Sequence, residues 1–343
     1  MSFEAVRHRV SFVGASGPLD ADLTIPAWLG PHPAVVLMGG RSGPRDRGRW
    51  VQTLAWYGLA VLSWDSPGWG STAGIRHWQA PDERTLELVS AVKFLQTIRD
   101  VSPERIAVIG SDTGCWAAAL GAALSSQIAA VALLAAPCGG APAQEVTRLG
   151  QRLHARGFAP EEVALAQLIL AERIRRLSQG EDPGAVLAAE GPCRTAGWYS
   201  WLPGHSASEL TAFATLADYH PPTLLGSVRC PVLGVYGEDD PATPAWPNAQ
   251  LLHDALATSP GRDHQVLVLP RTDDAFAPQP TTWPDPAATE SGSALPPAGS
   301  WTMVRMPGDW HRDLAGAVSD WLSSRLGPYR PSSSTPTPLP RAG

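Results

Sequence analysis

The sequence predicts an α/β fold, a doubly wound and mostly parallel sheet of about eight strands with an inserted helical cap. Short apolar runs of strand length recur along the chain with helical segments between them, as in consecutive βαβ units. The runs are apolar on both faces, which suits strands that helices cover from both sides. The alternation stops after residue 139 and resumes near residue 230, and helical periodicity fills the interval.

The strands are expected in chain order. Residues 6–25 resemble two antiparallel strands joined by a turn near residues 14–17. Leu88, Val92 and Leu95 are spaced at i, i+4 and i+7, which gives a helix one buried stripe. The candidate parallel strands are the apolar runs 34–38, 59–62, 106–109, 128–134, 232–236 and 266–269.

The predicted domain boundaries follow the breaks in this alternation. Residues 1–139 and 229–327 form the predicted α/β core, and residues 140–228 form the helical cap. The tail, residues 328–343, is rich in serine and proline, and we expect it to be disordered because it has little apolar surface to bury.

Composition and charge exclude several classes of protein. The 343 residues carry a formal charge of -6, which argues against a basic nucleic-acid-binding face. No apolar stretch approaches the roughly 18 residues of a membrane span, and the first residues lack the apolar core of a secretory signal. The four cysteines lie far apart, without a CxxC pair. We therefore expect a cytoplasmic protein with a small-molecule substrate and no metal, cofactor, membrane or nucleic-acid partner; its oligomeric state stays open.

One segment, Gly110-Ser111-Asp112-Thr113-Gly114, carries the predicted chemistry. It joins an apolar run to an alanine-rich helix. Small flanking residues permit a strained strand-to-helix turn that raises the central side chain above the sheet. The backbone N–H of Thr113 then points to the same place. Because the central residue is Asp112, the predicted catalytic group is a carboxylate instead of a serine hydroxyl.

Further motifs, taken in order, resemble the α/β-hydrolase superfamily. Residues 38–43 (MGGRSG) resemble its oxyanion-hole loop, and residues 65–71 (DSPGWGS) resemble its turn after the fourth strand. Residues 237–240 (GEDD) end a strand where that family places its triad acid, and residues 306–311 (MPGDWH) resemble its histidine loop. The resemblance spans residues 6–327. It implies the α/β-hydrolase fold and the catalytic residues Asp112, His311 and Asp240, with Arg41 and Thr113 at the oxyanion site.

Three positions keep alternatives open. Asp239 competes with Asp240 for the place of the acid. Residues 271–276 (RTDDAF), which include Asp273 and Asp274, also resemble a histidine loop, with Asp274 in the histidine's place. Either residues 302–306 form the last strand and His311 is catalytic, or the site lacks a histidine. Arg41 is either a surface arginine or a residue that grips an anionic substrate or leaving group.

An aspartate at the elbow implies one of three functions. As a base, Asp112 takes a proton from an activated carbon, and a small acylated metabolite loses a carboxylate such as acetate; ester cleavage is the related outcome. The layout resembles the acetate-eliminating α/β-hydrolase-like proteins of tetronate polyketide pathways, which implies secondary metabolism. The alternative is a nucleophilic Asp112, as in the haloalkane dehalogenases and epoxide hydrolases, although Thr113 stands where dehalogenases usually carry tryptophan. The second alternative is a non-catalytic protein that binds a ligand.

The remaining candidates lie outside these motifs. Trp198 and Trp201 are more often packing residues than binding residues, yet they are candidates for an aromatic wall under the cap. His154 and His264 are expected to be solvated and without a role.

Overall fold

The structure is a computed structural model that describes residues 5–15, 17–39, 47–65, 80–215, 221–273, 276, 302–305 and 314–327. Within these residues, nine strands form one sheet in the order β1-β2-β4-β3-β5-β6-β7-β8-β9. The strands are β1 (Ala5–Gly14), β2 (Gly17–Pro26), β3 (His32–Met38), β4 (Ala60–Trp64), β5 (Val101–Ser111), β6 (Ala130–Leu134), β7 (Val232–Gly237), β8 (His264–Leu269) and β9 (Thr302–Arg305). The predicted fold class is confirmed.

The strand directions follow from the chain order. β2 is antiparallel to both β1 and β4, and each pair from β4 across to β9 is parallel. The first two strands are therefore the antiparallel pair predicted for residues 6–25. β3, β4, β6, β7 and β8 are buried along their whole length, which explains why they read as continuous apolar runs. β9 corresponds to the last strand predicted for residues 302–306, which is the alternative in which His311 follows the strand.

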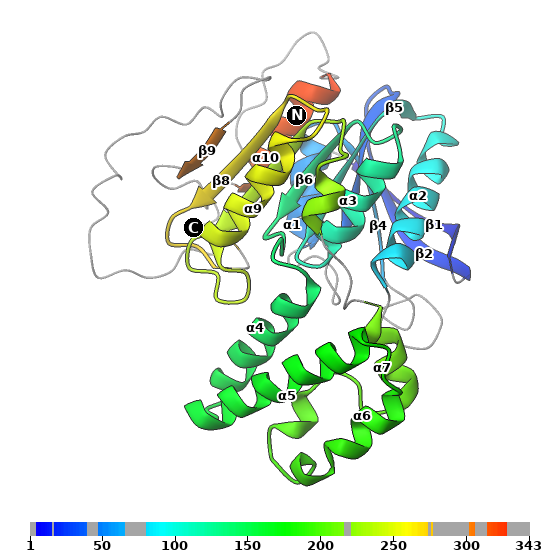
Figure 1. The fold of residues 1–343 in the computed structure, drawn as a ribbon. Helices are drawn as coiled ribbons and strands as arrows, with labels where there is room; N and C mark the ends of the chain where they lie inside the picture. Colours follow the sequence, from blue (N-terminus) through cyan, green and yellow to red (C-terminus); the bar gives the residue numbers. More distant parts are fainter. Residues whose placement is uncertain are drawn as a thin grey trace.

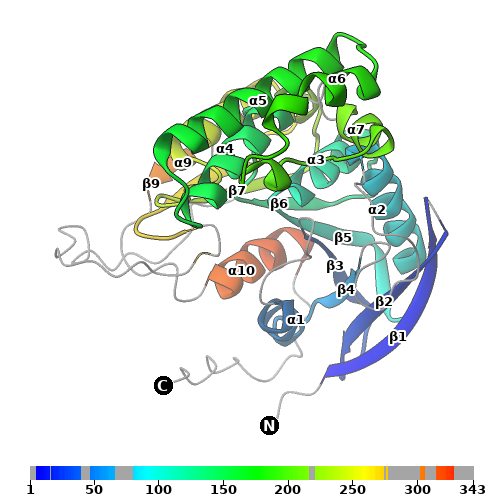
Figure 2. The ribbon, with the colours of Figure 1, turned by 90° about the horizontal axis from the view of Figure 1, so that it is seen from below.

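Helices cover both faces of the sheet (Figure 2). α1 (Arg47–Trp56) and α10 (Leu314–Leu326) lie on one face, and α2 (Pro81–Gln96), α3 (Gly114–Leu124) and α9 (Ala245–Ala257) lie on the other. Each face has its own apolar cluster. The predicted stripe of α2 is confirmed, because Leu88, Val92 and Leu95 are each at most 1% exposed.

The chain between β6 and β7 is helical in its described part. It contains α4 (Ala141–His154), α5 (Pro160–Ser178), α6 (Pro183–Ala189), α7 (Ala207–Ala214) and α8 (Pro221–Leu225), with short turns at Gly191–Cys193 and Tyr199–Trp201. α4 to α7, here called the helical layer, lie beside the sheet and its helices (Figure 1). The layer has a third apolar cluster that includes Leu153, Leu170 and Leu210. Leu225 and Val228 instead belong to a sheet cluster.

The structure tests the predicted exposure of two histidines, but it does not test the predicted domain division or the predicted tail. His154 is exposed as expected, but the expectation for His264 was wrong, because β8 begins at this residue and leaves it 2% exposed. The division into a core and a cap stays a prediction, and the tail 328–343 lies outside the described residues. None of the described helices is long and apolar enough to cross a membrane.

Candidate active site

The turn from β5 to α3 has the strained geometry expected of a nucleophile elbow. Asp112 has a φ of 51°, in the left-handed region that non-glycine residues rarely adopt. Its N–H donates to the Leu134 carbonyl at 2.9 Å, and its own carbonyl accepts from the Cys115 N–H at 3.0 Å. A Cβ at Gly110 would lie 2.8 Å from the Cys115 Cα, and one at Gly114 would lie 2.4 Å from the Met38 carbonyl oxygen. Both glycines are therefore required by close packing of backbone on backbone.

The end of β3 approaches this elbow closely. A Cβ at Gly114 would also lie 2.5 Å from the Gly39 carbonyl oxygen, so these two backbones are in contact. The buried guanidinium of Arg84, on α2, donates a hydrogen bond to the same Gly39 carbonyl and fixes its direction. Burial lowers the pKa of Arg84, and the charges of Glu87 and Asp112 oppose that effect. Arg41 lies outside the described residues.

Thr113 presents two polar groups at the elbow. Its backbone N–H donates to no described residue, and its buried hydroxyl also has no partner among them. An N–H directly after the elbow residue is where an oxyanion donor is needed. The oxyanion role of Thr113 stays a prediction.

Asp112 forms an ion pair that the sequence did not predict. The Nη2 group of Arg148, on α4, donates to Asp112 Oδ1. The Asp112 side chain is 37% exposed and that of Arg148 is 17% exposed. We expected an oxyanion loop and a histidine near Asp112, but the structure adds a guanidinium from the helical layer.

Arg148 lies among several carboxylates. Burial works to lower its pKa, but the charges of Asp112, Glu145 and Asp240 and the hydrogen bond to Asp112 outweigh burial, and the pKa is raised. Arg148 is in the second turn of the first helix after β6. A search for polar residues in the first turns of that helix would have found it.

The acid position favours Asp240 over Asp239. Asp240 is 4% exposed, and its Oδ1 accepts hydrogen bonds from the N–H groups of Ala242 at 2.8 Å and Thr243 at 2.9 Å. Asp239 is exposed, and its backbone N–H donates to the Thr272 carbonyl. Asp240 is also the one whose charge acts on Arg148. Asp240 is therefore the better placed acid.

The turn after β8 packs directly against the acid loop. A Cβ at Gly237 would lie 2.4 Å from the Asp273 carbonyl oxygen and 2.5 Å from that of Thr272. The turn that includes Asp273 thus touches the end of β7, at the edge of the sheet where the site lies. Asp274 and His311 lie outside the described residues. β9 runs parallel to β8, so the two strands end at the same edge of the sheet, and His311 follows β9 in the sequence.

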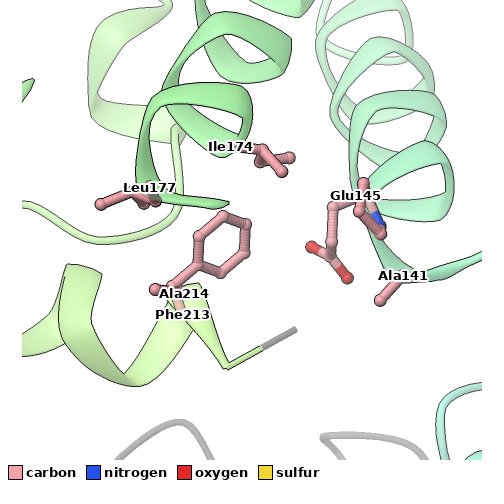
Figure 3. Close-up of a pocket in the computed structure, with 7 residues that line it drawn as sticks. Ala141, Glu145, Ile174, Leu177, Phe213 and Ala214 are labelled. Carbon is pink, nitrogen blue, oxygen red and sulfur yellow. The ribbon is translucent and has the colours of Figure 1, made fainter. Parts of the chain in front are cut away.

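A small pocket lies within the helical layer (Figure 3). It is a narrow recess, too tight to hold a water molecule, and α4, α5 and α7 form its walls. The carboxylate of Glu145 points into it (Figure 3). Ala141, Glu145 and Arg148 are spaced at i, i+4 and i+7, so the pocket and the ion pair share one face of α4. The lining residues are Ala141, Pro142, Glu145, Ile174, Leu177, Phe213 and Ala214.

The two candidate tryptophans lie elsewhere in the helical layer. Trp198 is 2% exposed within the apolar cluster of the layer. The guanidinium carbons of Arg152 and Arg156 lie 5.3 and 4.8 Å from the centre of the Trp201 ring. Neither tryptophan lines the described pocket, and aliphatic side chains and Phe213 take the place of the expected aromatic wall.

Two buried cysteines lie near the site. Within the described part of the chain, no group of three histidine, cysteine, aspartate or glutamate residues is arranged to hold a metal ion. Burial raises the pKa of the Cys138 thiol to about 12, and it raises the pKa of Cys115 as well. Both thiols are therefore protonated at neutral pH, and a thiol is a weak nucleophile.

Sequence comparisons give a match over part of the chain. No family model matches the chain. The uncharacterized protein PA2218 of Pseudomonas aeruginosa is 36% identical over 112 residues, which cover 31% of this chain and 30% of that protein. The chain thus spans less than a third of the length of this relative.

Solved structures match most of the chain at low identity. The 2,6-dihydroxy-pseudo-oxynicotine hydrolase has a TM-score of 0.56 at 16% identity, with 94% of this chain and 68% of that chain covered. DcsB, in complex with its substrate analogue, has a TM-score of 0.57 at 16% identity, with 95% and 99% covered. The α/β hydrolase GrgF from Penicillium sp. sh18 has a TM-score of 0.52 at 19% identity, with 78% and 91% covered. The chain has the α/β-hydrolase fold.

Proposed function

We propose that the chain is an α/β-hydrolase-fold enzyme that eliminates a carboxylate from a small acylated metabolite, with Asp112 as the base. One observation carries the proposal. Asp112 stands at the strained elbow with Oδ1 bound to Arg148, while Oδ2 accepts no hydrogen bond from the described residues. A carboxylate oxygen held open at this position can accept a proton from a bound substrate.

The reaction uses groups that the elbow supplies. Asp112 takes a proton from the carbon between a carbonyl group and the carbon that bears the acyloxy group. The electrons of the C–H bond form a carbon–carbon double bond, and the C–O bond to the acyloxy group breaks. The carboxylate leaves with that electron pair, and Asp112 later returns the proton to water. The Thr113 N–H stabilises the negative charge that develops on the carbonyl oxygen.

A second candidate uses the same open oxygen as a nucleophile. Asp112 would attack carbon and form an ester, and a water molecule activated by His311 would then hydrolyse it. The side chain is 37% exposed, which leaves room for the attack. Two solved structures with a similar fold, the 2,6-dihydroxy-pseudo-oxynicotine hydrolase and an esterase of Pyrococcus furiosus, have names compatible with ester chemistry but do not separate the two candidates.

A β-acetoxy ketone tests the proposal, because each route gives different products in oxygen-18 water. Elimination yields an enone, seen by its ultraviolet absorbance, and unlabelled acetate. Ester hydrolysis yields a hydroxy ketone and labelled acetate. A nucleophilic Asp112 incorporates the label into its own carboxylate, which mass spectrometry of the peptide detects. We expect the enone, unlabelled acetate and unlabelled Asp112.

Two variants complete the experiment. Asp112→Asn should abolish turnover, and full activity in this variant would defeat both candidates. His311→Ala should slow elimination without trapping substrate, whereas a stoichiometric adduct on the intact protein would show that Asp112 is a nucleophile. Binding of a ligand without turnover, unchanged in Asp112→Asn, would favour a non-catalytic receptor.

A further inference from the structure

The guanidinium of Arg148 has more hydrogen-bond donors than the described residues use. A guanidinium offers five N–H groups. In the described part of the chain, Arg148 forms one hydrogen bond, from Nη2 to Asp112 Oδ1. Its side chain is 17% exposed, so the remaining donors lie in a mostly enclosed space beside the elbow. No Arg148 nitrogen is among the fully buried polar atoms of the described residues that lack a partner, so these donors still reach solvent and are open to water or to a ligand.

The position of Arg148 relative to Asp112 matters for charge. Before the reaction, the guanidinium faces the negative carboxylate of Asp112. When Asp112 takes a proton, that charge disappears, and a negative charge forms on the departing carboxylate once the C–O bond breaks. A cation in contact with Asp112 can therefore exchange the first anion for the second.

We propose that Arg148 is the residue that binds the carboxylate leaving group. The inference rests on the proposed function, because it assigns a residue to the leaving group of that reaction. As the C–O bond breaks, its electron pair goes to the acyloxy oxygen, and the planar guanidinium receives the two carboxylate oxygens through paired N–H donors. Asp112 holds the proton, and no other reactant is needed.

The surroundings restrict where a ligand anion is favoured. On the same face of α4, the carboxylate of Glu145 points into the pocket, where the other lining side chains are apolar (Figure 3). A carboxylate in that pocket would meet the charge of Glu145. The Arg148 end of this face is therefore the place for an anion.

Binding of acetate alone tests the inference without any turnover. Ligand-observed NMR at low ionic strength gives the dissociation constant of acetate for each variant. Arg148→Gln should weaken binding at least tenfold, and Arg148→Lys should weaken it less, because lysine keeps the charge but loses the paired donors. Arg152→Gln is the matched control, since Arg152 is exposed one turn further along α4, and binding should not change.

Acetate binding to Asp112→Asn distinguishes a binding role of Arg148 from a purely structural role. The carboxylate of Asp112 competes with acetate for the guanidinium, so its removal should tighten acetate binding about tenfold. Unchanged or weaker binding in Asp112→Asn would overturn the inference. Equal binding in the wild type and Arg148→Gln, or no binding in the wild type, would also overturn it.

The two proposals fail separately. If the β-acetoxy ketone is not converted but acetate binds in this pattern, the elimination proposal falls and the anion site stands. If the ketone is converted through Asp112 but acetate binding ignores Arg148, the assignment of Arg148 falls and the function stands.

Discussion

Two arginine–carboxylate pairs, Arg173–Glu190 within the helical layer and Arg148–Asp112 at its border, differ in how many of their polar groups form hydrogen bonds. In the layer, Arg173 donates from Nε to Glu190 Oε1 at 2.8 Å and from Nη2 to Glu190 Oε2 at 2.5 Å. Its Nη1 donates to the carbonyl oxygens of Pro203 and Gly204, and the Tyr199 hydroxyl donates to Glu190 Oε2 at 2.8 Å. The side chains of Arg173 and Glu190 are 0% and 7% exposed.

The pair at the elbow has the same chemical groups in a different setting. Arg148 makes one hydrogen bond to Asp112 in the described part of the chain, and both side chains reach solvent. A sealed network with every polar group bonded fixes the structure around it, whereas a partly open pair can exchange a partner. We therefore expect Arg173 to serve stability, and the proposal above assigns Arg148 to binding.

The largest effect is expected when the sealed pair is broken. Arg173→Met leaves the carboxylate of Glu190 buried without its cation, and the loss should be about 3–5 kcal/mol of unfolding free energy. Urea denaturation followed by circular dichroism measures it. The double variant Arg173→Met/Glu190→Leu should recover part of the loss, since the unpaired charge is gone. A loss below about 1 kcal/mol in the single variant would contradict the comparison.

The next test concerns a buried titratable group with a neutral partner. The ring of His264 is 2% exposed, and its Nε2 lies 2.7 Å from the Ser259 hydroxyl oxygen. Burial lowers the pKa of His264, although nearby backbone carbonyls and Asp263 oppose it. The folded protein then favours the neutral ring. The contribution of the buried neutral ring to the free energy of unfolding is therefore complete above the ordinary histidine pKa of about 6.5. It is lost as the pH falls below that value.

Unfolding measured from pH 7.5 to pH 5 checks this sign. We expect stability to decrease toward pH 5 and the decrease to be smaller in His264→Gln. Burial also lowers the pKa of His32, so some of the decrease should remain. His154→Gln, at an exposed histidine of α4, is the matched control. An identical profile in His264→Gln and the wild type would disprove the assignment.

A smaller effect is expected at the edge of the sealed network. Tyr199→Phe removes one hydrogen bond to Glu190 Oε2, which keeps its bond to Arg173. The expected loss is about 1.5–2 kcal/mol, as for a hydrogen bond to a charged group. Thermal unfolding by calorimetry measures it. A loss as large as that of Arg173→Met would mean that the hydroxyl, and not the guanidinium, holds the network together.

The sequence predicted what depends on local chemistry. Central strands are apolar on both faces because both faces are covered, and α2 has its stripe because a helix repeats every 3.6 residues. The elbow was predictable because other backbone segments pass so close to Gly110 and Gly114 that neither position has room for a Cβ atom. The choice of Asp240 over Asp239 was not, because burial at a strand end depends on the neighbouring turn.

Contacts between distant segments escaped the sequence analysis. Arg148 is separated from Asp112 by 36 residues, and its role depends on where α4 packs after β6. Trp198 was a candidate binding residue because of its type, but the packing of the helical layer buries it. The support of Gly39 by Arg84 also joins two elements 45 residues apart. Residue type alone does not specify such partners.

The smallest change in stability is expected where the change in binding is largest. Arg148→Gln leaves Asp112 without its cation, but the Asp112 side chain is 37% exposed and water can solvate it. The cost should therefore stay below about 1 kcal/mol, as for partly exposed ion pairs. Urea denaturation of Arg148→Gln beside Arg152→Gln and Arg173→Met measures it. A loss of several kcal/mol in Arg148→Gln would place this pair with the sealed one and assign it to stability, whereas a near-native value with weakened acetate binding separates the two pairs by function.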